Sequence, residues 1–299
     1  MSVGQEGDGI YFPYAVASDG AHVWIVNTNN TITELRAATG TLLRVIKGDG
    51  LSHPISVSSD GTHVWIANVR DSVTELRAST GSLVKVIKGS TYQFDDPQWV
   101  DSDGTHVWIT NHAGSSVTEL RAATGALVRV ITSGIHYPIP VSSDGRDVWI
   151  VNGNKSVTEL RPSTGGVVRV LKGHGFTSPL AIASDGVHVW VTNYANDPGS
   201  SVTELRASTA AIVREIKGVH YPSAIATDGL HVWVAGAENT VTELRASTGA
   251  LVRVIKGSRY GFDNPFAISS DGTHVWVVNL HNSTVTELRA STGAVVRTI

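Results

Sequence analysis

The chain has 299 residues, of which 41% are hydrophobic and 16% are charged, and its formal net charge is -3. This balance lacks the clustered Lys and Arg that binding to double-stranded nucleic acid or an anionic membrane requires. The chain has no cysteine, which excludes disulfides, thiolate metal sites and cysteine nucleophiles. No apolar run approaches the ~20 residues that cross a bilayer, and residues 1–9 lack the basic start and apolar stretch of a signal peptide. We therefore expect a soluble, unexported monomer, with a cytoplasmic location favoured.

A repeat fills nearly the whole chain after residue 10. Seven tryptophans mark its copies at spacings of 41 or 43 residues, whereas an eighth, Trp99, lies outside this register. The marker residues are Trp24, Trp65, Trp108, Trp149, Trp190, Trp233 and Trp276. Because no low-complexity break or charged linker interrupts the repeat, we expect residues 1–10 to be a lead and residues 11–299 to form a single domain.

Each copy predicts four short strands. In the last copy, residues 265–272 end in an Asp-Gly turn, residues 274–278 are rich in β-formers, and residues 284–289 and 294–299 alternate around a turn. Four strands per repeat of this length are typical of a propeller blade. The sequence therefore predicts an all-β, seven-bladed β-propeller with four antiparallel strands per blade. Each blade is contiguous in sequence, and the ring closes by packing blade 7 on blade 1.

Two segments carry a family resemblance. Trp108-Ile-Thr-Asn111 and Trp190-Val-Thr-Asn193, each followed by Ser-Val-Thr-Glu-Leu-Arg, resemble the bacterial YVTN-type propeller repeat. That group is related to NHL and streptogramin-lyase-like propellers. The resemblance covers about residues 11–299 and implies the propeller fold, but such propellers serve many unrelated functions.

Polar residues that recur in every blade are interpreted as scaffold, because a site needs its chemistry only once. One histidine slot is filled in six blades and by Asp147 in blade 4. Its histidines are His22, His63, His106, His188, His231 and His274. A glutamate, from Glu34 to Glu287, and an arginine two residues later also recur in all seven blades. The fourth strand adds a basic residue in every blade, namely Arg44, Lys85, Arg129, Arg169, Arg214, Arg253 and Arg297. We expect these charges to form exposed ion pairs along the outer strands, worth roughly 0–1 kcal/mol each.

Variation in length points to one face of the ring. The turns within each blade that precede the tryptophan and that follow the glutamate never change in length, whereas the connections between blades range from 5 to 9 residues. The loops between the second and third strands also vary. In an up-and-down blade these two variable connections share one side, where binding loops would sit on a rigid scaffold.

Aromatic and metal-binding residue types gather in these variable loops. The predicted ligand-binding side chains are Tyr92, Phe94, Trp99, Tyr137, Tyr221, Tyr260 and Phe262. Imidazole and carboxylate groups around a channel mouth supply the donors that a divalent metal ion uses. The candidate metal ligands are His53, Asp95, His136, His220 and Asp263, and their alternative interpretation is a solvated rim.

Three classes of function stay open, of which we favour a non-catalytic one. A binding module would hold a small molecule, metal or protein segment at the loop face. A streptogramin-lyase-like enzyme would use Mg²⁺ and a base, for which the resemblance and the break at Gly236-Ala-Glu-Asn239 suggest Glu238, His220 and His281. A recently amplified or engineered scaffold would have no evolved ligand, as seven unchanged Thr-Glu-Leu-Arg segments suggest.

Overall fold

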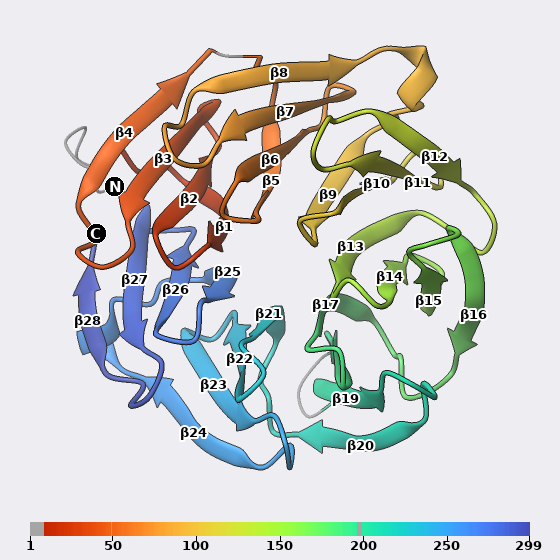
Figure 1. Ribbon diagram of the computed structural model, residues 1–299. Coiled ribbons are helices and arrows are strands. Elements are labelled where there is room, and N and C mark those ends of the chain that lie inside the picture. Colours follow the sequence, from red (N-terminus) through yellow and green to blue (C-terminus); the bar gives the residue numbers. More distant parts are fainter. Residues whose placement is uncertain (1–8, 49, 196–198) are drawn as a thin grey trace.

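The computed structural model describes residues 9–48, 50–195 and 199–299, which form seven four-stranded sheets arranged in a ring (Figure 1). Within each sheet the strands follow sequence order and pair antiparallel. The prediction of an all-β, seven-bladed propeller with contiguous blades is confirmed. No helix in the described ranges is long and apolar enough to cross a membrane.

The strand bounds repeat closely from blade to blade. Blade 1 contains β1 (Pro13–Ser18), β2 (His22–Asn27), β3 (Thr31–Arg36) and β4 (Leu42–Lys47). Blade 2 contains β5 (Pro54–Ser59), β6 (His63–Asn68), β7 (Ser72–Arg77) and β8 (Leu83–Lys88). Blade 3 contains β9 (Pro97–Ser102), β10 (His106–Asn111), β11 (Ser116–Arg121) and β12 (Leu127–Ile131). Blade 4 contains β13 (Pro138–Ser143), β14 (Val148–Asn152), β15 (Ser156–Arg161) and β16 (Gly166–Lys172).

The remaining blades follow the same plan. Blade 5 contains β17 (Pro179–Ser184), β18 (His188–Asn193), β19 (Ser201–Arg206) and β20 (Ile212–Lys217). Blade 6 contains β21 (Pro222–Thr227), β22 (His231–Gly236), β23 (Thr240–Arg245) and β24 (Leu251–Lys256). Blade 7 contains β25 (Pro265–Ser270), β26 (His274–Asn279), β27 (Thr284–Arg289) and β28 (Val295–Thr298). Two 3-10 turns, η1 (Ser90–Tyr92) and η2 (Ser258–Tyr260), lie in the two nine-residue connections between blades.

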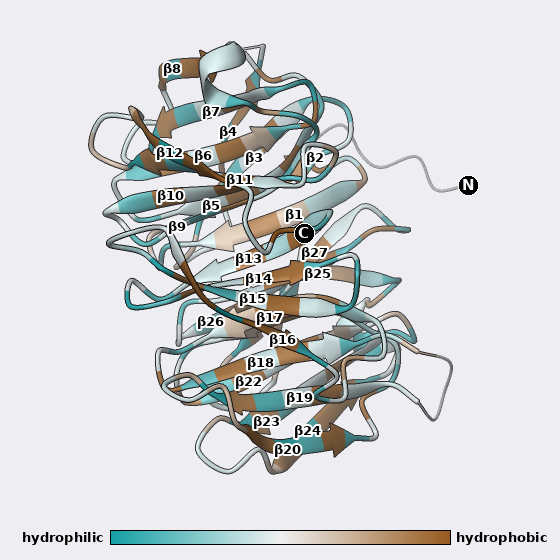
Figure 2. Ribbon diagram, turned by 90° about the vertical axis from the view of Figure 1, so that its right-hand side faces the viewer, coloured by the Kyte–Doolittle hydropathy of each residue, from teal (hydrophilic) through white to brown (hydrophobic). Residues whose placement is uncertain are grey.

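The hydrophobic core lies between neighbouring blades. Each repeated tryptophan is fully buried and packs against the sheet of the next blade, as Trp24 does against Val57 and Val64. Figure 2 shows the blades edge-on, with hydrophobic stretches within the strands. A single blade could not bury both of its faces, so the ring as a whole supplies the core.

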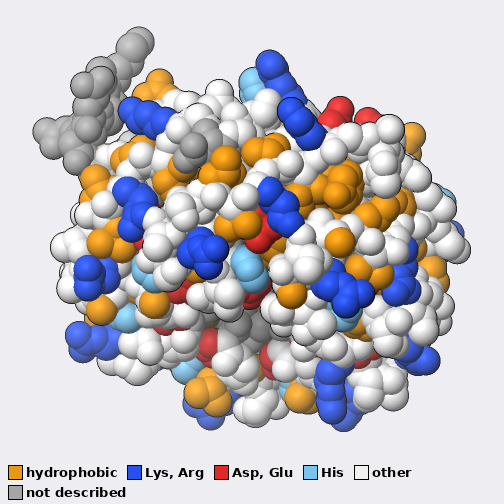
Figure 3. Space-filling view, turned by 45° about the horizontal axis from the view of Figure 1, so that its top comes forward, with side chains coloured by type: hydrophobic (Ala, Val, Ile, Leu, Met, Phe, Trp, Pro, Cys, Tyr) orange, Lys and Arg blue, Asp and Glu red, His pale blue; other side chains and the backbone are white. Residues whose placement is uncertain are grey.

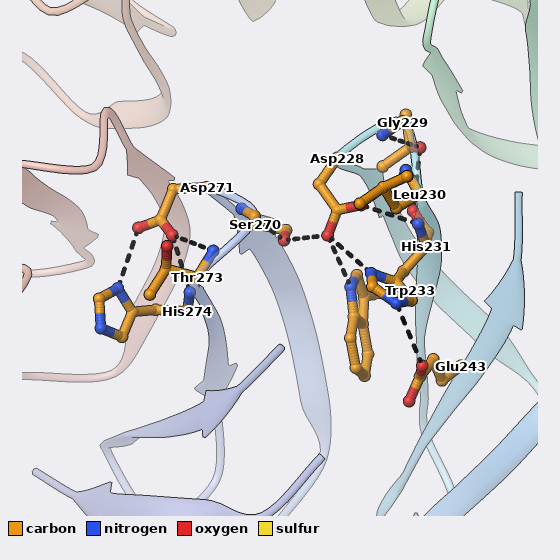
Figure 4. Close-up of polar contacts among 12 residues, drawn as sticks. Asp228, Gly229, Leu230, His231, Trp233, Glu243, Ser270, Asp271, Thr273 and His274 are labelled. Atoms are coloured by element: carbon orange, nitrogen blue, oxygen red, sulfur yellow. Dashed lines mark hydrogen bonds and ion pairs between the residues drawn. The ribbon is translucent and has the colours of Figure 1, made fainter. Parts of the chain in front are cut away.

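The histidine slot is structural, as the repetition indicates. In blade 7 the Asp271 carboxylate accepts hydrogen bonds from the backbone N–H groups of Thr273 and His274, at 2.9 and 2.7 Å. The imidazole of His274 lies between this carboxylate and Glu287, with nitrogen–oxygen distances of 3.4 and 3.8 Å. Figure 4 shows the same arrangement in blade 6 around Asp228 and His231. The histidine therefore links the turn to the third strand.

The outer ion pairs form between predicted residues, but the prediction that these pairs are exposed was wrong. The repeated glutamates are buried, with Glu34 and Glu204 fully inaccessible. Their partner is the basic residue of the fourth strand, as in Arg44 Nε–Glu34 Oε2 at 2.8 Å, and not the arginine two residues later. Burial raises the pKa of Glu34, and the charges of Arg44 and His22 oppose this shift. The alternation of a strand placed both arginines near the glutamate, and only the cross-strand register selects the partner.

Neighbouring blades are joined by a hydrogen bond that the repeat supplies. At six of the seven interfaces the turn aspartate of one blade accepts from the serine hydroxyl that ends the first strand of the next, as in Ser59 Oγ to Asp19 Oδ2 at 2.7 Å. Thr227 of blade 6 donates instead to the His231 carbonyl. The same contact joins Ser18 Oγ to Asp271 Oδ2 at 2.8 Å, which connects blade 1 to blade 7. The ring therefore closes by the packing used at the other interfaces, as predicted.

Candidate functional site

The innermost strands β1, β5, β9, β13, β17, β21 and β25 surround the central channel (Figure 1). Each begins with a proline, and the pairing register shifts directly after it, as between Pro13 and Ala15 or between Pro265 and Ala267. Such a β-bulge leaves one residue unpaired and re-aims its side chain. The bulge therefore turns the residue after the proline toward the channel in six blades, whereas Ile55 of blade 2 packs against the core between blades.

These bulged residues line a cavity of about 270 Å³ at the end of the channel where the innermost strands begin. All seven blades contribute to it, and the bulged residues that line it are Tyr14, Gln98, Ile139, Leu180, Ser223 and Phe266. The proline before this slot recurs in all seven blades, whereas the slot itself holds aromatic, aliphatic and polar residues in different blades. The residue at this slot is not conserved across the repeat, which is what a single binding site in a repetitive ring requires.

Three aromatic side chains, Tyr14, Trp99 and Phe266, line the cavity. The rings of Tyr14 and Phe266 are 4.6 Å apart between centroids and tilted by 51°, and Trp99 lines the wall. Trp99 is only partly buried, whereas the seven repeated tryptophans are inaccessible. Burial raises the pKa of the Tyr14 hydroxyl, which has no hydrogen-bond partner among the residues that the structure describes. The cavity therefore offers ring faces and one unused hydroxyl.

A carboxyl group lies next to Trp99 along β9. Asp101 Oδ2 accepts a hydrogen bond from the backbone N–H of Ser143 in blade 4 at 2.7 Å, and its Oδ1 accepts from Ser58 Oγ in blade 2 at 3.1 Å. Burial raises the pKa of Asp101 to about 6, although the hydrogen bonds from Ser143 and Ser58 act to lower it. The other blades carry only small residues here, namely Ala17, Ser58, Ser142, Ala183, Ala226 and Ser269. Asp101 thus joins three blades through one titratable group.

Of the predicted ligand-binding residues, Trp99 alone lines this cavity. Phe94, Tyr260 and Phe262 are 8%, 6% and 8% exposed and belong to the cores between blades, and Tyr92 packs beside them. The pairs Tyr92–Phe94 and Tyr260–Phe262 stack at 5.5 Å. These four rings pack inward because the 3-10 turns fold back over the blade junctions, which differs from the expected role at the surface.

The two other predicted tyrosines lie at the variable face. Tyr137 is 58% exposed and contacts His112 with 5.8 Å between ring centroids. Tyr221 contacts Tyr194 at 5.7 Å. Both pairs join neighbouring blades outside the cavity, so these rings remain candidates for contact with a larger ligand or a protein segment.

The candidate metal ligands are spread around the variable face. Within the described ranges no three His, Asp or Glu side chains converge with the geometry of a metal site. Asp263 Oδ1 lies 3.6 Å from His281 Nδ1, and both of these side chains are well exposed. His53 and Asp95 are also exposed. The set of His53, Asp95, His136, His220 and Asp263 therefore stays a prediction without a shared centre.

The break in blade 6 has a structural explanation. A Cβ atom at Gly236 would lie 2.5 Å from the carbonyl oxygen of His220, because the shortest connection between blades passes directly over this position. Asparagine occupies the slot in the other six blades, where Asn27 for example accepts from the backbone N–H of Tyr11. Backbone proximity alone accounts for the glycine. Glu238 itself is exposed in the adjacent loop.

The cavity is lined by the first strands, whereas the residues predicted from the sequence to bind a ligand lie mostly in the loops. The signal was present in the first strand, where the proline recurs in every blade and the residue after it varies between aromatic, aliphatic and polar types. Asp101 was missed for the same reason, since it interrupts a run of alanine and serine inside a strand.

Comparison with known proteins supports the fold. No protein-family model matches the sequence, and no curated protein gives a significant match. Hydrazine synthase from Kuenenia stuttgartiensis is similar in structure, with a TM-score of 0.80 at 17% identity over 94% of this chain and 96% of that one. The computationally designed Ika8 protein has a TM-score of 0.71 at 17% identity over 98% and 88%. U3-55K has a TM-score of 0.72 at 14% identity over 89% and 87%. The chain is therefore a seven-bladed β-propeller, and these similarities concern the fold alone.

Proposed function

We propose that this propeller is a binding protein that holds a small, mainly apolar, ring-containing molecule in the channel cavity. The supporting observation is that Tyr14, Trp99 and Phe266 all line one cavity of about 270 Å³, in which the Tyr14 and Phe266 rings are in contact. Ligand pockets are mostly apolar with few polar groups that fix orientation. Here the Tyr14 hydroxyl and the Gln98 amide fill that polar role.

The size of the cavity limits the ligand to one or two fused rings, since about 270 Å³ lies near the lower end of small-molecule pockets. Aromatic rings favour offset or tilted contacts, which the Tyr14–Phe266 pair already shows. Ring stacking against Trp99 would contribute most of the affinity, because large aromatic side chains dominate binding sites.

The test is calorimetric titration of benzyl alcohol, indole and 2-naphthol into the parent protein and into two variants. Trp99→Ala should weaken the best of these ligands by about tenfold or more, which is about 1.4 kcal/mol. Leu230→Ala is the matched control, since Leu230 is 72% exposed and outside the cavity. Equal affinity in the parent and in Trp99→Ala would rule the cavity out as the site.

The elimination enzyme and the metal site are separate proposals that the loop face would have to carry. The enzyme needs Glu238, His220 and His281 to act together with Mg²⁺, and the metal site needs at least three of the predicted ligands. Titration of Mg²⁺, Zn²⁺ and Ni²⁺ into the parent and into His136→Ala, His220→Ala tests both. The resemblance to YVTN-type repeats likewise stays a proposal, supported by the Trp-x-Thr-Asn segments of blades 3 and 5.

A further inference from the structure

The Gln98 side chain lines the channel cavity in one fixed orientation. Its amide Nε2 lies 2.7 Å from Asp96 Oδ1. An ionised carboxylate only accepts hydrogen bonds, so the amide must turn its N–H group toward Asp96 and its oxygen away from it. Gln98 lines the cavity whereas Asp96 does not, which places the amide oxygen Oε1 on the side of the cavity.

The backbone of Asp96 is itself held on both sides. Its N–H donates to Asp71 Oδ1 of blade 2 at 3.1 Å, and its carbonyl accepts from the N–H of His112 at 3.0 Å. Its φ angle of 55° lies in the left-handed region, which Asp and Asn enter more readily than other residues with a side chain. Asn264 has the same φ angle in the equivalent slot of blade 7. The Asp96 carboxylate therefore has a fixed base from which to orient the Gln98 amide.

The oxygen of Gln98 is an unused acceptor in the cavity lining. The two serine hydroxyls of the lining are engaged, since Ser56 Oγ accepts from the Val100 N–H at 3.2 Å and Ser223 Oγ donates to the Pro265 carbonyl at 2.7 Å. Within residues 9–48, 50–195 and 199–299, Gln98 Oε1 accepts no hydrogen bond. A ligand that fills the cavity would exclude water from this oxygen, and an unpaired buried acceptor is costly. The ligand therefore has to supply a hydrogen-bond donor.

The cavity lining carries no charged side chain among the residues that the structure describes. A charged ligand would lose its hydration there without gaining a partner of opposite charge, which is costly. Charge on the outside does not replace such a partner. In Figure 3 the Lys and Arg side chains are scattered over the surface in view among hydrophobic and other side chains. The cavity therefore favours a neutral ligand, recognised by a hydrogen bond and by ring contacts.

We infer that the ligand of this cavity is a neutral ring system with an N–H or O–H group that donates a hydrogen bond to Gln98 Oε1. This inference rests on the proposed function, in which the ring of the ligand lies against Tyr14, Trp99 and Phe266. Gln98 then determines specificity, and Asp96 is a positioning residue that acts through it. Ring contacts alone do not select indole over benzothiophene, which has a similar size and shape but no N–H group.

The test is calorimetric titration of indole and benzothiophene into the parent and three variants, and its readout is the ratio of the two dissociation constants. Gln98→Met removes the amide and keeps the length of the side chain. Asp96→Asn keeps the backbone contacts, but the new amide can donate or accept, so it no longer fixes the orientation of Gln98. Gln93→Met is the matched control, since Gln93 is exposed and lies outside the cavity. Thermal unfolding checks that each variant is folded, and Asn264 in the equivalent slot indicates that Asp96→Asn will be.

The preference for indole over benzothiophene should fall about five- to tenfold in Gln98→Met, about two- to threefold in Asp96→Asn and not at all in Gln93→Met. An unchanged preference in Gln98→Met, with both ligands still bound, would overturn the inference and leave the channel site intact. Equal weakening of both ligands in Gln98→Met would show that Gln98 only shapes the wall, and would overturn the inference as well. If neither ligand binds to the parent, the proposed function itself fails and the inference fails with it.

Discussion

Ser18 Oγ donates a hydrogen bond to Asp271 Oδ2 at 2.8 Å, and this contact joins the first strand of the ring to the last blade. Ser59 and Asp19 make the same contact between blades 1 and 2 at 2.7 Å. Because the two contacts are equivalent, Ser18→Ala and Ser59→Ala should each lower the free energy of unfolding by about 1 kcal/mol in urea titrations. A neutral Ser18→Ala beside a destabilising Ser59→Ala would mean that another contact closes the ring.

Ala210 occupies a turn position at φ 54° where the other six blades carry glycine. A side chain in this left-handed region is strained, so Ala210→Gly should stabilise the protein by about 0.5–1 kcal/mol. The reverse change, Gly249→Ala, should destabilise it by more, since the new Cβ would lie 2.7 Å from Cδ of Arg214. Thermal unfolding of both variants checks this, and loss of stability in Ala210→Gly would contradict it.

Asp147 replaces the repeated histidine, and its blade holds the most perturbed glutamate. Burial raises the pKa of Glu159 to about 7; Arg169 opposes this shift, and the charge of Asp147 adds to it. A raised carboxyl pKa contributes stability at low pH that is lost as pH rises from about 4.5 through 7. Asp147→His removes the repulsion and should stabilise the protein by about 1–2 kcal/mol at pH 8 but little at pH 5.

Urea titrations at the two pH values measure this difference, with Arg146→Gln in the same turn as the control. An equal effect of Asp147→His at pH 5 and pH 8 would contradict the assignment to Glu159.

Asp101 provides a second pH-dependent prediction. Since burial raises its pKa to about 6, its contribution to stability is present below its unfolded pKa, near 4, and is lost as pH rises through 6. Asp101→Asn should therefore stabilise the protein at pH 8 by up to about 3 kcal/mol, with a much smaller effect at pH 4. Asp95→Asn, at an exposed carboxyl, should be neutral at both values. Destabilisation of Asp101→Asn at pH 8 would show that the charged form is needed for the contacts with Ser58 and Ser143.

The ring could be predicted from the sequence because local patterns define the four strands of each blade. The buried tryptophan and the Asp-Gly turn repeat at nearly fixed spacing along the chain. The role of the histidine slot could be predicted for the same reason. The burial of Phe94 and Phe262 between blades was not predicted, because an aromatic residue in a loop can pack inward or outward, and the 3-10 turn decides which. The sequence offered both Arg36 and Arg44 as partners of Glu34, since side-chain alternation gives the face of the strand but not the cross-strand register that selects Arg44.

The channel cavity required the structure for a different reason. The bulge after the proline turns the next residue toward the channel axis. The alternation of side chains along a regular strand does not predict this orientation. Once the bulge is known, the non-repeated slot from Tyr14 to Phe266 becomes the most informative part of the sequence. The structure also explains why blade 6 has Gly236 where the other blades have asparagine. The carbonyl oxygen of His220 approaches too closely for a side chain at this position.

The central claim is that the ligand of this propeller lies within the channel. Its most direct test is a crystal structure of the parent protein soaked with indole or 2-naphthol. Electron density for the ligand between Trp99, Tyr14 and Phe266 is the predicted result, and the same soak of Trp99→Ala should leave that position empty. Ligand density only at the loops or between blades, with the channel cavity filled by water alone, would contradict the claim.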